Sequence, residues 1–393
     1  MKKIAFISTG FTGSIIPLVN EYLKLNYLVD LFLVVFKTQN QSEHEAFQLS
    51  HGNYGYGIHC VPKDAIVGVE WLSNKELFTT YLVCNFGNGR GMIKKGLAHI
   101  LQLYVKNKLV KKINQANYDY INVVGHDIFC SELSLSLKNK RILHTFHEVY
   151  NHSSAEKEIL PSVSKIVKAK IPIIVPSEHL KSYLNAEVAY NKVCSIKMGL
   201  FIGYKSFDKN VSIVNLPASY ILFLGNLLPY KGLDLLYESY LLLKRQGRDV
   251  NIVIAGGGNS PLLEKMKNND DFTIINRWIL NDELVSLIKK SKAIICPYHS
   301  ASQSGLPVTA YVFGKPVIAT DVGAMSEYVL DKETGYLVAP NNPNLLSEKM
   351  WEIYTDSMSF NNEVLDKIIP SWEDISLKYL ECFNNKYNCN NDD

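Results

Sequence analysis

The sequence predicts an α/β protein built on two doubly wound parallel sheets. Short apolar runs alternate with segments of helical period from one end of the chain to the other, the pattern of parallel sheets covered by helices. The 393 residues exceed what one ordinary core holds, and 47% of them are hydrophobic while 20% are charged. We therefore expect two domains, each with its own buried sheet.

The expected strands fall into two groups. Each strand is a short apolar run bounded by turn residues. In the first half the runs are 4–8, 29–36, 120–124, 141–145 and 171–175, and in the second half they are 220–224, 251–255, 273–275, 293–296 and 316–319. The polar, glycine-bearing segments 37–57 and 85–91 are expected to be excursions from the first sheet.

The two halves are expected to join within 199–217. We assign 1–205 to an N-terminal Rossmann-like domain and 206–370 to a C-terminal one. An amphipathic pattern after Pro370 predicts a terminal helix in 371–393 that packs back on the N-terminal domain. Ligands of such sheets bind beyond the carboxyl ends of the strands. Two sheets that face each other would therefore place the site in the cleft between the domains.

Two segments of the second half share one design. The strand 220–224 ends at a glycine, a short loop follows, and Lys231 precedes a helix expected over 233–243. The strand 293–296 is likewise followed by the loop 299–305 and by a helix entered through Pro307. Two helix N-termini beside one lysine favour the binding of a diphosphate.

Composition excludes several other classes of site. The formal net charge of +3 is too small to indicate nucleic-acid binding. The seven cysteines are scattered and form no C-x-x-C pair, which argues against a disulfide framework and a zinc site. The first apolar run is too short for a signal peptide, and no window approaches the roughly 20 apolar residues of a membrane span. A cytoplasmic location is expected.

Residues 220–340 resemble the nucleotide-binding half of family 4 glycosyltransferases, which have the two-domain GT-B fold. The resemblance rests on FLGNLLPYKG at 223–232, IAGGG at 254–258, GKPVIATDVGAMSE at 314–327 and GYLVAP at 335–340. Weaker similarities are GFTG at 10–13, VGHD at 124–127, TFHE at 145–148 and PSEH at 176–179.

The resemblance implies a donor site for a nucleotide-diphosphate sugar. Lys231 matches the family's lysine beside the diphosphate, whereas Asn226 stands where the family has an arginine, and Arg277 is a candidate replacement. The family's two glutamates are absent from 301–310, where the chain resembles a Gln-Ser-Gly variant of that loop. The expected donor contacts are Gly13, Asn226, Gln303, Ser304, Gly305, Leu306, Thr309 and Glu327. For Gly13 a tight turn is the alternative, and for Glu327 the capping of a following helix.

The chemistry that follows from the resemblance is sugar transfer with retention of anomeric configuration. Lys231 and the backbone amides of 304–306 would stabilise the charge that develops on the departing diphosphate. His126, after the strand 120–124, would contact the donor sugar or support the transition state. His147 and Glu148, after the next strand, would line the acceptor side. A purely structural role is the alternative for each histidine.

A basic amphipathic segment lies in the first half. Its lysines alternate with apolar residues over 94–112, and they are Lys94, Lys95, Lys106, Lys108, Lys111 and Lys112. One interpretation is a solvated helix face packed on its sheet. The other is peripheral contact with the inner face of the cell membrane, which would suit a lipid-linked acceptor.

The predicted function is that of a retaining, metal-independent glycosyltransferase of the hexosyltransferase type. It would move a sugar from a nucleotide sugar to a glycan or lipid-linked acceptor, and family habit suggests cell-surface polysaccharide assembly. The nucleotide sugar is a substrate, so no cofactor is expected, and no D-x-D-like pair follows a suitable strand to hold a metal ion. Two alternatives remain open: a nucleotide-sugar epimerase of the same fold, and a non-catalytic partner of an active transferase.

Overall fold

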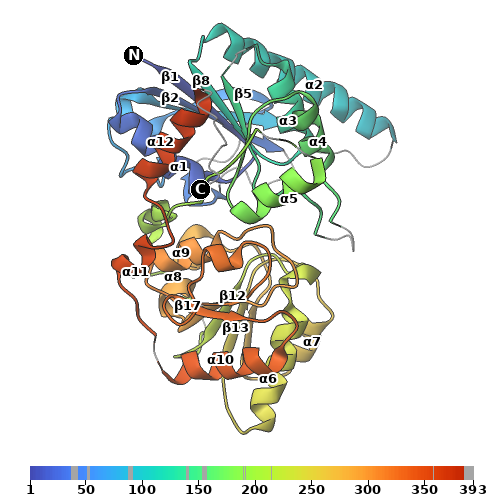
Figure 1. The fold of residues 1–393 in the computed structure, drawn as a ribbon, viewed down its shortest axis with the longest axis vertical. Helices are drawn as coiled ribbons and strands as arrows, with labels where there is room; N and C mark the ends of the chain where they lie inside the picture. Colours follow the sequence, from blue (N-terminus) through green and yellow to red (C-terminus); the bar gives the residue numbers. More distant parts are fainter. Residues whose placement is uncertain are drawn as a thin grey trace. The chain divides into compact units, whose positions relative to one another are not determined.

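The chain forms two compact units in the computed structural model (Figure 1). Unit 1 comprises Met1–Tyr150, Glu158–Lys197 and Trp372–Asp393, and unit 2 comprises Asn151–Lys157 and Met198–Ser371. The structure describes residues 1–36, 43–50, 54–86, 92–138, 141–152, 157–188, 190, 192–213, 215–356 and 358–384. The sequence set the junction after residue 205, whereas unit 2 takes over at Met198, because η3 (Ile202–Phe207) packs against helices of unit 2.

Unit 1 is built on an eight-stranded sheet in the order β11-β10-β9-β8-β1-β2-β7-β5. Neighbouring strands are parallel, except that β5 runs antiparallel to β7. The bounds are β1 (Lys3–Ser8), β2 (Leu28–Phe36), β5 (Gly57–Val61), β7 (Phe78–Asn85), β8 (Tyr120–Val124), β9 (Ile142–Thr145), β10 (Ile173–Val175) and β11 (Val193–Ser195). A small antiparallel sheet contains β3 (Glu43–His44), β4 (Phe47–Leu49) and β6 (Ile66–Val67).

Several of these strands were not predicted from the sequence. The segment expected to be an excursion contains β3, β4 and the first residue of β5 within its described part, and β7 was not expected at all. The first four residues of β7 alternate between buried and half-buried, so β7 begins without the continuous apolar run that revealed β1 and β2. Residues 87–91 of the second expected excursion lie outside the described residues.

Helices cover both faces of this sheet. They are α1 (Thr12–Lys24), α2 (Met92–Gln115), α3 (Ile128–Ser136), α4 (Pro161–Lys168), α5 (Glu178–Val188) and α12 (Trp372–Phe383), with the single turns η1 (Lys63–Ala65) and η2 (Lys75–Leu77). Successive residues of β1 point to opposite faces: Ile4 and Phe6 share a core with α1 and α12, and Ala5 and Ile7 share one with α2 and α3.

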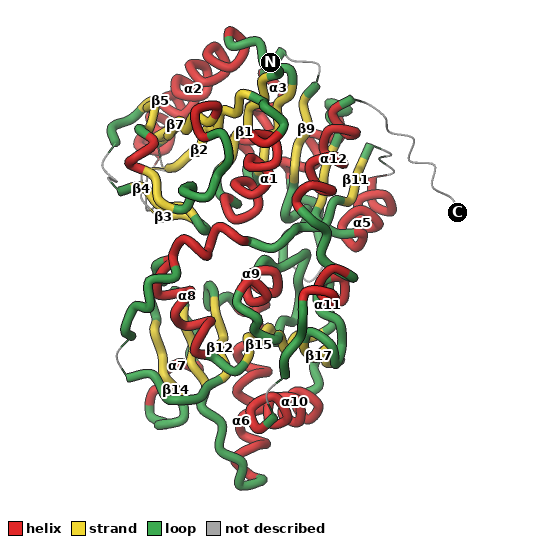
Figure 2. Tube along the Cα trace, turned by 90° about the vertical axis from the view of Figure 1, so that its left-hand side faces the viewer, coloured by secondary structure: helices red, strands yellow, loops and turns green. Residues whose placement is uncertain are grey.

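The terminal helix α12 packs against α1, from the other end of the chain (Figures 1 and 2). Ile375, Tyr379 and Phe383 of α12 are buried in the core that also holds the α1 residue Tyr22. The Tyr22 hydroxyl donates a hydrogen bond of 3.3 Å to the Ser376 carbonyl. The last helix of the chain is thus part of unit 1.

Unit 2 is built on a six-stranded parallel sheet in the order β14-β13-β12-β15-β16-β17. Its strands are β12 (Ile221–Leu224), β13 (Ile252–Ala255), β14 (Phe272–Ile275), β15 (Ala293–Cys296), β16 (Val317–Thr320) and β17 (Gly335–Val338). Its helices are α6 (Leu233–Arg245), α7 (Leu262–Lys267), α8 (Asn281–Lys290), α9 (Leu306–Val312), α10 (Pro343–Thr355) and α11 (Asn362–Asp366). The predicted fold class, two doubly wound α/β sheets, is confirmed.

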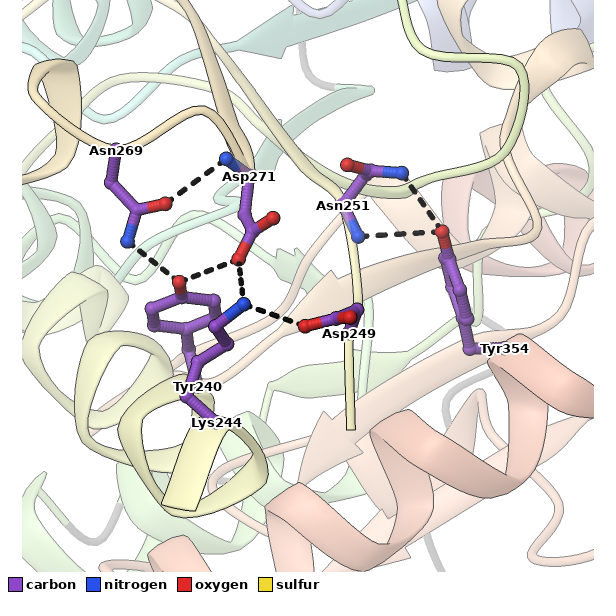
Figure 3. A network of polar contacts seen from close by, with 7 residues as sticks. All are labelled: Tyr240, Lys244, Asp249, Asn251, Asn269, Asp271 and Tyr354. Carbon is purple, nitrogen blue, oxygen red and sulfur yellow. Dashed lines mark hydrogen bonds and ion pairs between the residues drawn. The ribbon is translucent and has the colours of Figure 1, made fainter. Parts of the chain in front are cut away.

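A polar network closes the amino-terminal edge of this second sheet (Figure 3). Lys244, near the end of α6, contacts Asp249 at 2.6 Å and Asp271 at 2.9 Å, and Asp271 also accepts a hydrogen bond of 2.7 Å from Tyr240. Asn251 donates to the Tyr354 hydroxyl of α10. The network lies at the edge opposite the carboxyl ends of the strands, beyond which ligands of such sheets bind.

Candidate functional site

The two loops that the sequence singled out in unit 2 lie side by side. Lys231 ends the turn η4 (Pro229–Lys231) and directly precedes Gly232 and α6. The backbone N–H of His299, in the second loop, donates a hydrogen bond of 2.8 Å to the Tyr230 carbonyl. Gly232 has φ 70°, and a Cβ atom there would lie 1.8 Å from the Pro297 carbonyl oxygen. Only glycine allows the two loops to approach this closely.

Lys231 lies beside two tyrosine rings. Its Nζ is 4.0 Å from the ring centroid of Tyr298 and 5.2 Å from that of Tyr230. Tyr298 is 1% exposed, and burial raises its pKa well above the usual range. Burial also raises the pKa of the neighbouring Cys296 thiol to about 11. Both groups are therefore neutral near pH 7, and the ammonium group of Lys231 has uncharged neighbours on this side.

The loop before α9 is partly buried and internally hydrogen-bonded. The Leu306 N–H donates to the Ser304 hydroxyl at 3.3 Å, and the Thr309 hydroxyl donates to the Gly305 carbonyl at 2.7 Å. Ser304 and Thr309 are both buried. The Leu306 amide and the Thr309 hydroxyl, both expected to contact the donor, are thus engaged within the loop and helix. Their roles toward a donor stay predictions.

The other expected donor contacts of unit 2 lie on separate elements. Asn226 is exposed just beyond β12, and Gln303 is half-buried in the loop before α9. Glu327 ends the single turn η5 (Met325–Glu327), and in the fully described stretch after it no helix begins before Pro343. The capping of a following helix by Glu327 was therefore a wrong alternative.

Arg277 is engaged elsewhere. Its two terminal nitrogens contact the two carboxylate oxygens of Glu283 at 2.7 Å each, and Nη1 also donates to the Trp278 carbonyl. This pairing lowers the pKa of Glu283. The proposed substitution of Arg277 for the family arginine finds no support in this geometry.

In unit 1 the expected acceptor-side residues form one cluster with His126. His126 follows β8 and precedes Asp127, whose carboxylate caps α3 through the Cys130 N–H at 2.9 Å. The Nε2 atom of His126 lies 3.9 Å from a carboxylate oxygen of Glu148. Its backbone carbonyl accepts a hydrogen bond of 2.6 Å from Ser162. The strand end and the helix cap together fix the backbone of His126.

Phe11 joins this cluster and was missed by the sequence analysis. Its ring stacks on His147 with centroids 4.1 Å apart and planes 5° apart, and it meets the His126 ring edge-on at 5.9 Å. Phe11 has φ 60°, an uncommon backbone conformation for a bulky residue that needs support from its surroundings. Phe11 lies within the motif GFTG, in which only the glycines had been expected to matter.

Gly13 lies in the first turn of α1, where the sequence placed a donor phosphate. Its backbone N–H is hydrogen-bonded to the carboxylate of Glu45. The neighbouring Thr12 hydroxyl donates to the Glu45 backbone carbonyl. An acidic side chain thus lies at this helix N-terminus, and the role of Gly13 toward a phosphate stays a prediction.

His147 should make the stability of unit 1 depend on pH. It is 4% exposed, and burial, followed by the nearby His126, lowers its pKa from 6.5 to about 3. Below pH 6.5 the unfolded chain therefore binds a proton at this ring that the folded chain excludes. The contribution of His147 to the free energy of unfolding is fully present above pH 6.5 and is lost as the pH falls toward 3. We expect His147→Gln to remove about 1.4 kcal/mol per pH unit from this slope.

The measurement is urea unfolding followed at pH 7, 6 and 5. His59, half-buried and bonded to the Gly55 carbonyl, supplies the control variant His59→Gln, which should keep the wild-type slope. His144, whose pKa burial lowers to about 4, retains part of the dependence in every variant. An unchanged slope in His147→Gln would show that this ring does not titrate as described.

Comparisons with known proteins address the fold and the second half of the chain. Residues 205–368 match the model of the family described as glycosyl transferases group 1. An uncharacterized glycosyltransferase of Methanocaldococcus jannaschii is 29% identical over 203 residues, which are 50% of this chain and 52% of that relative. The match thus spans about half the length of this curated relative.

Solved structures align over almost the whole chain. Sucrose-phosphate synthase from Thermosynechococcus elongatus has a TM-score of 0.66 at 17% identity and covers 98% of this chain and 99% of its own. HepE from Anabaena, in complex with UDP and glucose, has a TM-score of 0.58 at 14% identity and covers 98% of both chains. The fold is GT-B. At such identities the likeness concerns the GT-B fold alone.

The part of the chain that the structure describes has neither a cluster of metal ligands nor a membrane-spanning helix. No group of three His, Cys, Asp or Glu side chains there could hold a metal ion. None of the helices in the described part of the chain is both long and apolar enough to cross a bilayer. The metal independence of this GT-B protein stays a prediction.

Proposed function

We propose that the protein is a retaining glycosyltransferase that uses a nucleotide-diphosphate sugar as donor. The observation that carries the proposal is the placement of Lys231 beside the loop 299–305, at the carboxyl edge of the unit 2 sheet. This geometry lies inside the stretch 205–368 that matches glycosyl transferases group 1. A cation and the ends of two strand-to-helix loops suit a diphosphate leaving group.

Lys231 would act on the departing diphosphate. As the bond between sugar and phosphate breaks, negative charge grows on the phosphate oxygens, and a fixed ammonium group stabilises it. The buried Tyr298 ring lies on one side of that ammonium group, and an apolar neighbour of this kind would strengthen the interaction with a phosphate. The acceptor hydroxyl would approach on the face the diphosphate leaves and transfer its proton to a phosphate oxygen, so the anomeric configuration is retained.

The acceptor would be a glycan or lipid-linked sugar, handled by the cluster in unit 1. His147, with its pKa near 3, is neutral at pH 7 and serves as a hydrogen-bonding group. His126 and Glu148 are partly exposed and can reach a ligand. The family resemblance supports three further parts of the proposal. They are a hexose donor, independence from metal ions and a role in cell-surface polysaccharide assembly.

A panel of nucleotides tests the donor class. A ligand present at 100 times its Kd stabilises a folded protein by about 2.7 kcal/mol. We therefore expect one of UDP, GDP or ADP, or a sugar derivative of it, to raise the melting temperature clearly above that with the others. If no nucleotide shifts the melting temperature, the proposal fails.

Turnover separates the proposal from its two alternatives. With the bound donor and an extract of acceptors, new glycan together with free nucleoside diphosphate supports transfer. A converted nucleotide sugar would indicate an epimerase. Binding with neither product would indicate a non-catalytic partner, an alternative favoured by the exposed Asn226 and by the engagement of Arg277 with Glu283.

We also propose that one face of α2 contacts an anionic membrane surface. Val105, Leu109 and Ile113 face the core of unit 1. Of the six lysines in the predicted basic helix, Lys106 is buried and paired with Glu132 at 2.9 Å, Lys112 lies over the Tyr81 ring, and the side chains of Lys94 and Lys95 lie outside the description. The sequence suggested one continuous basic face. The structure differs, because Lys106 and Lys112 are engaged with other residues of unit 1.

The outward face of α2 is smaller and mixed. It exposes Ile100 (63%), Tyr104 (55%), Lys108 and Lys111, which recur at helical spacing. Apolar and aromatic groups beside cations suit the boundary between lipid headgroups and acyl chains. This composition favours the membrane interpretation over that of a simple solvated face.

Liposome sedimentation tests this surface. We expect sedimentation with vesicles containing phosphatidylserine at low salt and its loss in Lys108→Glu/Lys111→Glu, because each lysine near such a surface contributes about 1 kcal/mol. The charge-matched control is Lys265→Glu/Lys267→Glu on the exposed part of α7. Equal sedimentation of the two double variants would contradict the assignment.

A further inference from the structure

His152 comes from the first half of the chain but belongs to unit 2. Asn151 and His152 directly follow Tyr150 of unit 1 but belong to unit 2, and from Glu158 the chain is part of unit 1 again. The imidazole of His152 is engaged on both edges: Nδ1 lies 3.0 Å from the Ser300 hydroxyl and Nε2 lies 3.0 Å from the Ser302 hydroxyl. One ring thus bridges two serines of the loop before α9.

The same ring reaches the lysine loop. His152 stacks on Tyr230, with centroids 4.8 Å apart and planes 20° apart. Tyr230 precedes Lys231 and accepts the backbone hydrogen bond of His299. His152 therefore contacts both loops of the proposed diphosphate site, one through a ring face and the other through two hydroxyls.

Two hydroxyl groups of the loop 299–305 are held by His152. Ser302 is 1% exposed, so its hydroxyl needs a hydrogen-bond partner, and His152 supplies one. Other contacts support the loop as well: His299 lies 2.8 Å from a carboxylate oxygen of Asp234, and a Cβ atom at Gly323 would lie 1.7 Å from the Ala301 carbonyl oxygen. Ala301 is thus packed from one side while its two serine neighbours are held by His152.

We propose that His152 is a positioning residue of the donor site, which holds the loop 299–305 in the shape that receives a nucleoside diphosphate beside Lys231. The inference rests on the proposed function. A loop held before the ligand arrives loses less conformational entropy on binding, so the cost of losing His152 falls on donor affinity. His152 does not react with the donor, so the rate of the bound complex changes less.

Three variants separate the contacts of His152. His152→Phe keeps a ring to stack on Tyr230 and loses both hydrogen bonds. His152→Gln keeps one donor and one acceptor and should rescue part of the loss. His152→Phe/Ser302→Ala tests whether the two act together, because residues that act through each other give non-additive losses. His59→Phe, in unit 1, is the matched control.

The first measurement needs no ligand. Hydrogen–deuterium exchange of the peptide covering 299–306 should become faster in His152→Phe and stay at the wild-type rate in His59→Phe. Faster exchange is expected because the loop loses two hydrogen bonds that hold it. An unchanged rate would overturn the proposal, whatever the protein binds.

The second measurement is calorimetric titration with UDP, GDP and ADP. For the nucleotide that wild type binds, we expect about tenfold weaker binding in His152→Phe, the loss from two net hydrogen bonds, and no further loss in the double variant. With donor and acceptor, KM for the donor should rise more than kcat falls. Wild-type binding with equal binding by His152→Phe would overturn this inference and leave the proposed function intact. Absence of nucleotide binding by wild type would overturn both.

Discussion

Replacing Lys231 by alanine is expected to lower kcat for sugar transfer by about 10²–10³-fold, the usual cost of losing one group that stabilises developing charge. The Lys231 Nζ lies 4.0 Å from the buried Tyr298 ring. Burial keeps Tyr298 and Cys296 neutral near pH 7, so neither group can take over the role of the lysine charge. Because the lysine acts mainly on the leaving diphosphate, kcat should fall more than affinity for the intact donor.

The assay is initial-rate transfer at saturating donor, with nucleoside diphosphate release as the readout. Lys231→Arg keeps the charge and should recover part of the rate. Lys267→Ala removes an exposed lysine of α7 paired with Glu264 and should leave transfer unchanged. Transfer at the wild-type rate in Lys231→Ala would remove the central element of the proposed mechanism.

Replacing Gly232 by alanine is expected to destabilise unit 2 by about 3 kcal/mol, as a left-handed alanine and a backbone clash add together. The new methyl group would meet the Pro297 carbonyl oxygen at 1.8 Å, where backbone has to move. That movement separates the Lys231 loop from the loop 299–305. We therefore expect the variant to lose transfer activity along with stability.

Gly247 provides a closely matched control. It has φ 68°, against 70° at Gly232, and no atom lies within 4 Å of a Cβ built there. Gly247→Ala should therefore cost only the backbone strain, about 1–2 kcal/mol, and should keep activity. Thermal unfolding of both variants measures the difference. Equal destabilisation would mean that the approach of the two loops does not constrain Gly232.

Local patterns were sufficient for the buried strands. β8 lies where it was predicted, and β12, β13 and β15 begin within one residue of their expected starts, because fully buried parallel strands are continuous apolar runs between turns. β5, at the edge of the sheet, is mostly half-buried, and β7 begins with alternating buried and half-buried residues, so neither strand offers the continuous apolar run that a short window detects. The same limit explains the junction, because η3 belongs to unit 2 through its contacts with α8 and α9.

The candidate site divides in the same way. Lys231 and the loop 299–305 were found because a strand end, a glycine and a helix start are adjacent in the chain. Tyr298, between the expected strand 293–296 and the loop 299–305, was not singled out, although its ring lies against Lys231. Phe11 and His152 carry no pattern of their own, and their roles arise from partners 115 to 150 residues away, such as His126 and Ser302.

The amino-acid sequence alone determined the α/β class, the two sheets and the lysine-bearing loop, because periodicity and turn chemistry act over a few residues. The tertiary structure decided which side chains surround that loop: the pairing of Arg277 with Glu283, the stacking of Phe11 on His147, and the entry of His152 into unit 2. These contacts depend on where distant backbone segments come to lie, and packing and hydrogen bonding of the whole fold determine that.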